Sequence, residues 1–423
     1  MVYSVYAPIM VDMKYILHTS MKWISLFATF ETTGFILGTF IVMVKYKCIS
    51  RQLLLALFFT ALTIASAVIP LSPYLWVLYI CAFVIGIGSS VYAVFSTVWM
   101  IELWRDSRVP IIQMYEVCFG IGSVISTAAM KPYLIGETSA QNQTTYSDTE
   151  LIIDVNDVID RRSRLMIPTL IIGGCIITVP LALFIMHFIK PYKEPKVKNE
   201  DNSEDTTEDE KDNQNIKINV KLFDRKETPR KTTRLLFALF FTFYIIFETI
   251  FLKFSQTYFQ YSPLRLTAQK ATEIYTVAIT VYTVGLVLNI FYPIKFKIRT
   301  ILASHYVIII IGAILLIPAR TSVTTLWAAS VTMCLGFSGM FAGIYAFTEQ
   351  HMNFTTKLNS VFVLFRGVFT LITPFIVGNW IEDYSLVFIY MEFLFLAISI
   401  ALFLTILVII RKYSYLTQTN VVN

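Results

Sequence analysis

Charged residues are scarce in this 423-residue chain: Asp, Glu, Lys and Arg together make up 15% of it, whereas 56% of the residues are hydrophobic. The mean hydropathy is +0.66. Soluble domains carry about 25% charged residues. This shortage of charge excludes an ordinary soluble domain, and we interpret the chain as an all-α membrane protein with many spans.

Cysteine and histidine are also few, which excludes several kinds of site. Four of the five cysteines lie within apolar runs, so they provide no disulfide framework. The histidines lie near the ends of apolar runs and form no metal set: His18, His187, His305 and His351. No phosphate-binding glycine loop lies next to a lysine, and no basic patch is interleaved with aromatic residues. We therefore expect no enzyme activity, no metal, no cofactor and no nucleic-acid partner.

Long apolar runs are what the chain does have. A run of about 20 apolar residues can span a bilayer as a helix. Residues 1–10 resemble the end of one further helix, so the predicted fold has eleven full spans and one truncated first helix. The eleven runs are residues 22–44, 52–70, 74–98, 110–130, 166–189, 233–254, 271–292, 300–318, 324–346, 358–380 and 385–410.

The short loops differ in basic residues, and this difference predicts the orientation. Cytoplasmic loops are enriched in Lys and Arg. One set of alternate loops, with the C-terminal tail, carries Lys45, Lys47, Arg51, Arg105, Arg108, Lys295, Lys297, Arg299, Lys357, Arg411 and Lys412, and the other short loops carry only Arg265, Lys270 and Arg320. We therefore place the first set and the C-terminus in the cytoplasm, and we expect a multi-pass protein of the plasma membrane.

A long polar segment divides the spans into two groups. Residues 190–232 mix basic and acidic stretches, which is typical of a disordered cytoplasmic linker. The predicted domains are an N-terminal helical bundle (1–189), this linker, a C-terminal six-helix bundle (233–410) and a cytoplasmic tail (411–423). A weak internal repeat, GIGSSVYAVFS from Gly86 and GFSGMFAGIYA from Gly336, supports two related halves. This organisation is typical of a transporter with a binding site at the midplane.

Several segments resemble a known family: VYAPIMVDM, ISLFATFETTGFILGTF, WMIELWRDSRVPIIQMYEVCFGIGSVIS, FYIIFETIFLKFSQTY and AFTEQHMNFTTKLNSVFVLFRGVFTLITPFIVG. Together they resemble the fucose permease-like branch of the major facilitator superfamily, and within it the group called sodium-dependent glucose transporter 1. The resemblance implies two six-helix bundles, alternating access, a hexose or similar solute, and coupling to Na⁺ or H⁺. It also implies that VYAPIMVDM is the outer end of the first helix, with Asp12 just beyond it.

The chain also departs from that family. VMVKYKCISRQ lacks the Gly and Asp that relatives have between helices two and three, and Leu286 follows Gly285 where relatives often have Arg. A second possibility therefore stays open, namely a receptor or scaffold that transports nothing, or an inactive truncated isoform. In either case we expect a monomer in the lipid bilayer.

Polar residues recur at helical spacing in three spans, so each set shares one helix face. Hydroxyl, amide and carboxylate groups can bind sugar hydroxyls, and aromatic rings can cover a sugar ring. The alternative is that the hydroxyl groups only make hydrogen bonds between helices. The predicted substrate-binding residues are Tyr92, Ser96 and Trp99 in helix four, Gln113 and Glu116 in helix five, and Tyr244 and Glu248 in helix seven.

Charges inside the spans predict coupling and gating residues. A charge at membrane depth costs several kcal/mol unless it is paired, hydrated or protonated. Glu31 and Arg366 both lie near the middle of their spans, and we predict that they form an ion pair, either static or broken during transport. We predict that Glu116 carries a proton or coordinates the coupling cation, because Leu286 provides no cation on helix eight. Glu392 is predicted to lie at the membrane interface.

The predicted orientation can be tested by glycosylation. Asn142-Gln143-Thr144 lies in a predicted outer loop and Asn353-Phe354-Thr355 in a cytoplasmic one. We expect a glycan on Asn142 and none on Asn353, measured as a mobility shift after expression in a secretory-competent cell. A shift that survives Asn142→Gln but disappears with Asn353→Gln would show the opposite orientation.

Overall fold

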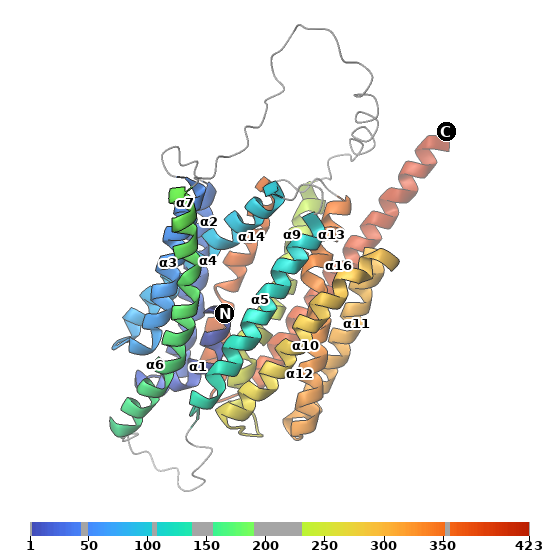
Figure 1. Cartoon of the computed structure of the whole chain (residues 1–423). Coiled ribbons are helices and arrows are strands. Elements are labelled where there is room, and N and C mark those ends of the chain that lie inside the picture. The colour runs from blue at the N-terminus through green and yellow to red at the C-terminus, as the bar shows by residue number, and fades with distance from the viewer. Residues whose placement is uncertain are drawn as a thin grey trace.

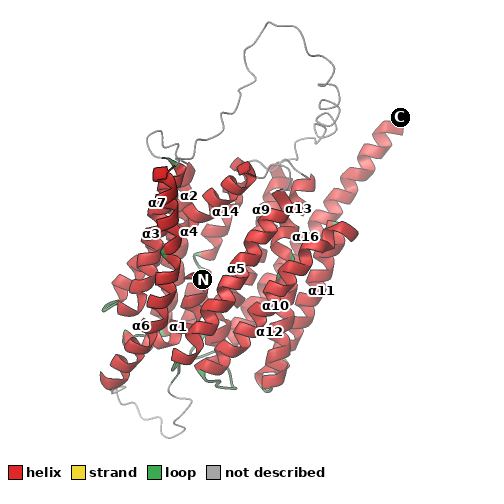
Figure 2. Cartoon of the chain, viewed as in Figure 1, coloured by secondary structure: helices red, strands yellow, loops and turns green. Residues whose placement is uncertain are grey.

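The computed structural model describes residues 2–43, 50–103, 108–137, 155–189, 231–351 and 356–422, and all regular elements in these ranges are helices (Figures 1 and 2). Nine helical segments among the described residues are long and apolar enough to cross a membrane. The predicted all-α membrane class is confirmed, and the count of eleven full spans stays a prediction. Asn142, Asn353 and most of the predicted linker lie outside the described residues.

The first half of the chain forms helices that pack along one another (Figure 1). α6 and α7 together form one apolar span, Asp157–Ile189. The helices are α1 (Val2–Ile16), α2 (Met21–Met43), α3 (Arg51–Val68), α4 (Leu75–Leu103), α5 (Arg108–Met130), α6 (Val155–Ile176) and α7 (Thr178–Ile189), with short 3₁₀ turns η1 (Ile69–Leu71) and η2 (Lys131–Tyr133).

The second half also consists of helices that pack along one another, and two of its spans are each divided into two helices. α12 and α13 share one apolar span, Val323–His351. α14 and α15 together cover the predicted span 358–380, and α15 begins with a proline near its first position. The helices are α9 (Lys231–Tyr261), α10 (Ala268–Lys295), α11 (Ile298–Leu316), α12 (Val323–Phe337), α13 (Met340–His351), α14 (Thr356–Thr370), α15 (Thr373–Trp380) and α16 (Leu386–Val422), with the 3₁₀ turn η4 (Pro318–Arg320).

Glycine allows two helices of the first half to cross closely. A Cβ atom added to Gly34 on α2 would lie 2.1 Å from the backbone oxygen of Phe83 on α4. A Cβ atom added to Gly86 would lie 2.0 Å from the backbone oxygen of Glu31. Real Cβ atoms do not approach so closely, so α2 and α4 pack backbone to backbone. This contact fixes Glu31 within the first half.

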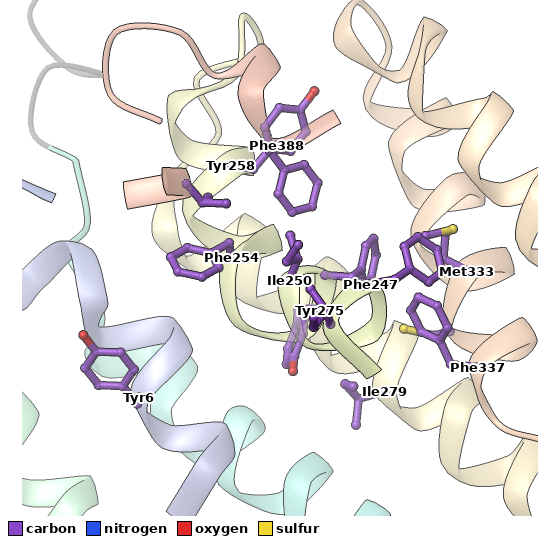
Figure 3. Packing of buried hydrophobic residues seen from close by; sticks show 14 of the residues in the cluster. Tyr6, Phe247, Ile250, Phe254, Tyr258, Tyr275, Ile279, Met333, Phe337 and Phe388 are labelled. Atoms are coloured by element: carbon purple, nitrogen blue, oxygen red, sulfur yellow. The ribbon is translucent and has the colours of Figure 1, made fainter. Parts of the chain in front are cut away.

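Helix α9 forms the centre of the second half. Its aromatic side chains pack against neighbouring helices: Phe247 lies 5.4 Å from Phe337, and Tyr258 lies 4.7 Å from Phe388, both measured between ring centroids (Figure 3). These four rings are almost fully buried. Aromatic pairs at such distances stabilise a core beyond the burial of their surface. α9 is therefore a firmly held helix on which polar side chains can be positioned.

Four pairs of helices connect the two halves among the described residues. α1 packs against α9, α2 against α14 and α15, and α5 against α10. Two crossings are close: a Cβ atom on Gly378 would lie 1.8 Å from Oγ of Ser25, and one on Gly120 would lie 2.5 Å from Oγ1 of Thr283. The ends of α1, α5 and α9 gather at one end of the molecule, the lower end in Figure 1, which we call the predicted outer face.

Candidate functional site

Lys14 of α1 connects the two halves at the predicted outer face. Its Nζ atom lies 2.6 Å from Oε1 of Glu382, between α15 and α16, and 3.4 Å from Oε2 of Glu137, which follows η2. Lys14 also donates a hydrogen bond of 3.0 Å to the hydroxyl of Tyr261 at the end of α9. Glu382 accepts a further bond of 3.1 Å from the backbone N–H of Met21. These contacts hold the outer ends of both halves together.

A buried ion pair supports this network from within the first half. Nη1 of Arg161 lies 2.6 Å from Oδ1 of Asp12, and the two side chains are 0% and 1% exposed. The same Asp12 oxygen accepts the backbone N–H of Gly136 at 2.8 Å, and Arg161 also donates to Asp157 at 2.8 Å. Gly136 has a φ of +76°, which favours glycine. The pair therefore fixes the segment that presents Glu137.

This pair corrects one expectation about the first helix. Asp12 was expected just beyond that helix, but α1 continues through Ile16. Burial of Met10, Val11 and Met13 on both sides of Asp12 accounts for the extension, because these side chains pack into the core. The sequence contained no local signal for Arg161, which lies 149 residues from Asp12.

Glu31 makes a different ion pair from the predicted one. Nζ of Lys253 on α9 lies 2.6 Å from Oε2 of Glu31 on α2, and Glu31 is 5% exposed. The predicted pairing with Arg366 is therefore wrong for this structure. The predicted span ended at residue 254, which placed Lys253 at a helix end, but α9 continues to Tyr261. Lys253 consequently lies two turns inside the helix, where it can reach Glu31.

Arg366 of α14 lies beside an aromatic ring and near two carboxylates. Its guanidinium carbon is 5.5 Å from the centre of the Phe35 ring on α2. Its charge acts on the carboxylates of Glu116 on α5 and Glu248 on α9. Among the described residues Arg366 makes no ion pair within 4 Å. Helix eight has the buried Leu286 where relatives often have Arg, and the positive charge that acts on Glu116 belongs to Arg366 on α14.

The same two carboxylates interact with each other across the halves. Glu116 belongs to the first half and Glu248 to the second, and each contributes to the electrostatic environment of Tyr282 on α10. We call Glu116, Glu248 and Arg366 the central charge cluster. Counted by formal charge, two negative and one positive, these three side chains carry one net negative charge.

Tyrosines surround the central charge cluster. The Tyr92 ring on α4 lies 6.1 Å from the Tyr115 ring on α5, and Tyr115 interacts with Ser96 as well as with Tyr92. Tyr244 is fully buried one turn before Glu248 and interacts with it. Rings and hydroxyls from three helices thus lie around the carboxylates.

The other predicted site residues, and the rest of the polar face of α5, differ in their surroundings. Trp99 is half-buried on α4, and the Gln113 side chain lies outside the described residues. Further along the polar face of α5, Ser123 and Thr127 donate to carbonyl oxygens of their own helix, at 3.0 and 2.9 Å. These two hydroxyls therefore bond within α5, whereas the alternative predicted hydrogen bonds between helices.

Glu392 corrects a third expectation. It was predicted at the membrane interface, but on α16 it is 0% exposed. α16 packs against α9, which places this face of the helix in the protein core. Neither carboxyl oxygen has a hydrogen-bond partner among the described residues.

Comparison with known proteins identifies the fold. A model described as Major Facilitator Superfamily matches residues 1–374. Two solved structures of the nucleoside transporter NupG are similar, with TM-scores of 0.60, for a mutant form, and 0.58. Both are 12% identical and cover 96% of this chain and 96% and 95% of their own. None of the curated proteins matches.

The buried pair predicts a large loss of stability when one partner is removed. Arg161→Met leaves Asp12 charged and unpaired, which costs about 3–5 kcal/mol in buried pairs. Arg164→Met is the matched control, because Arg164 pairs with Asp160 on the same helix but both are about half exposed; such pairs contribute about 0–1 kcal/mol. Thermal unfolding of the purified protein should show a much lower Tm for Arg161→Met alone. Equal Tm values for the two variants would contradict this account.

Proposed function

Because this chain belongs to the major facilitator superfamily, we propose that it is a secondary active transporter that moves a hexose or a similar small polar solute by alternating access. The observation that carries the proposal is the central charge cluster, in which each half contributes one carboxylate and α14 contributes the guanidinium. A site shared by both halves changes its surroundings when the halves rock, as alternating access requires.

The chemistry of the cluster suits a polyhydroxyl solute. Carboxylates accept hydrogen bonds from sugar hydroxyls, Arg366 donates them, and a tyrosine hydroxyl can do both. The rings of Tyr92 and Tyr115 offer apolar faces to the ring of a sugar. Predicted contacts from Ser96, Trp99, Tyr244 and Gln113 add to this set.

The same cluster supports coupling to a cation. One uncompensated negative charge at membrane depth is unfavourable. A proton or Na⁺ on Glu116 would neutralise it. Coupling follows if solute binding and cation binding stabilise the same arrangement of the two halves.

The outer network supports a closed outer side in this conformation. Besides Lys14, Lys131 of η2 pairs with Glu273 of α10 at 3.2 Å, which adds a contact between the halves at the same face. For solute to enter from that side, these contacts must break. We therefore take these contacts to represent the outer-closed state of the proposed cycle.

Counterflow into proteoliposomes tests the proposal. Vesicles loaded with unlabelled solute should take up the same labelled solute without any ion gradient, for at least one member of a panel of hexoses and nucleosides. The panel is then repeated with an inward Na⁺ or H⁺ gradient. Absence of counterflow for every solute would support the alternative, a receptor, a scaffold or an inactive isoform.

Glu116→Gln separates binding from coupling. The amide keeps the size and hydrogen bonding of the side chain but removes its charge, so counterflow should stay within about twofold of the parent. Gradient-driven accumulation should fall by about tenfold or more, because no group is left to carry the cation. Glu349→Gln, on the exposed end of α13, is the control and should behave as the parent. Parent-level accumulation by Glu116→Gln would exclude Glu116 as the coupling group.

A further inference from the structure

Two positively charged side chains of the second half, Lys253 and Arg366, lie next to the part of α2 that carries Glu31. Lys253 pairs with Glu31 at 2.6 Å, while the Arg366 guanidinium lies 5.5 Å from the centre of the Phe35 ring. Glu31 and Phe35 are four residues apart, so they lie one above the other on the same helix face. Arg366 therefore lies about one helical turn away from the position where it would meet Glu31.

The depths of these residues indicate how the pairing can change. At about 1.5 Å per residue, Lys253 lies roughly 12 Å from the outer end of α9, Glu31 roughly 15 Å from that of α2, and Arg366 roughly 21 Å from that of α15. Glu31 thus lies between the two cations in depth. An opening of the outer face would separate α2 from α9 near Lys253 and would leave the deeper contacts of α2 with α14, toward Arg366.

We propose that Glu31 exchanges partners during the cycle, with Lys253 as its partner when the outer face is closed and Arg366 as its partner when it is open. This inference rests on the proposed alternating access. The physical reason is the cost of leaving a charge unpaired in a low-dielectric site, which makes breaking a buried pair much more unfavourable than exchanging its partner. The exchange lets the halves separate while Glu31 stays neutralised.

In the open state the ammonium group of Lys253 would need other polar partners, and a small cavity beside it can provide them. This cavity has room for about one water molecule, and its lining residues other than Lys253 are Thr249, Thr370 and Thr373 together with Ile246, Ile250, Phe254 and Pro374. Thr370 is 7% exposed, and its Oγ1 atom has no hydrogen-bond partner among the described residues. Thr370 lies one helical turn beyond Arg366 on α14. A water and the Thr370 hydroxyl can therefore solvate the ammonium group once Glu31 has left it.

A cysteine reporter at position 25 measures which state is populated. Ser25 is 0% exposed, buried where α2 crosses Gly378 near the outer face, so opening uncovers it. Ser25→Cys is placed in a chain in which Cys48, Cys118 and Cys175 are replaced by serine; Cys118 and Cys175 are exposed. The purified protein is reconstituted in nanodiscs, where a water-soluble maleimide reaches both faces.

The two cations should shift labelling in opposite directions. Lys253→Met removes the partner of the closed state and should raise the labelling rate by about tenfold or more. Arg366→Met removes the partner of the open state and should lower the rate by about threefold or more. Arg366→Lys keeps the charge and should restore most of the parent rate. In a Glu31→Gln chain both Met substitutions should lose their effect, because the shared carboxylate is gone.

A static Glu31–Lys253 pair gives a different pattern. Arg366→Met would then label at the parent rate whether or not Glu31 is present, and that result overturns the exchange. Arg366→Gln, which retains hydrogen bonding, provides the same readout if the Met variant fails to fold. Labelling needs no solute, so shifts without any counterflow would reject the proposed transport but retain the exchange.

Discussion

The fold depends on how charges are accommodated in a medium that does not solvate them. An unpaired charge at membrane depth costs several kcal/mol, so each interior charge needs a partner or a proton. Asp12 and Arg161 belong to the same half, and their pair can persist while the halves move. Glu31 and Lys253 belong to different halves, and their pair must change when the halves separate. In the proposed cycle, the Asp12–Arg161 pair would therefore stay intact within one half, and the Glu31–Lys253 pair would be a contact that changes.

Helix α9 links the contacts at the predicted outer face to the central charge cluster. Its outer end carries Tyr261, which contacts Lys14, and two turns further in it carries Lys253. Glu248 follows toward the middle of the same helix. Aromatic rings pack around α9 (Figure 3), so in the proposed cycle this helix would connect a movement at its outer end with the carboxylate of the cluster.

The sequence predicted the apolar spans well and their ends less well. Hydropathy located α2 and α10 closely, because both ends of these spans change abruptly to polar residues. It ended the seventh span too early, since Ser255, Gln256 and Gln260 look like a loop. In the structure these three side chains are buried on α9. Because of that error, Lys253 was not recognised as a positive charge in the interior of the span.

The sequence predicted which residues belong to the candidate site, but it did not predict which of them are in contact. Helical spacing and cost of burial singled out Glu31, Glu116, Glu248 and Arg366. Their partners lie far away in the chain: Lys253 is 222 residues from Glu31, and Glu137 is 123 residues from Lys14. No local pattern encodes such distances, because they depend on how the two halves dock.

The central claim is that the two halves have a second arrangement in which the outer contacts are broken. The distance between spin labels on Tyr74→Cys, before α4, and Tyr384→Cys, after α15, measures this directly, since both native side chains are exposed near the outer face. Pulsed electron spin resonance in nanodiscs should give two distance populations, with the longer one favoured by Lys14→Met. A single short distance that neither solute, a Na⁺ or H⁺ change, nor Lys14→Met alters would contradict the account.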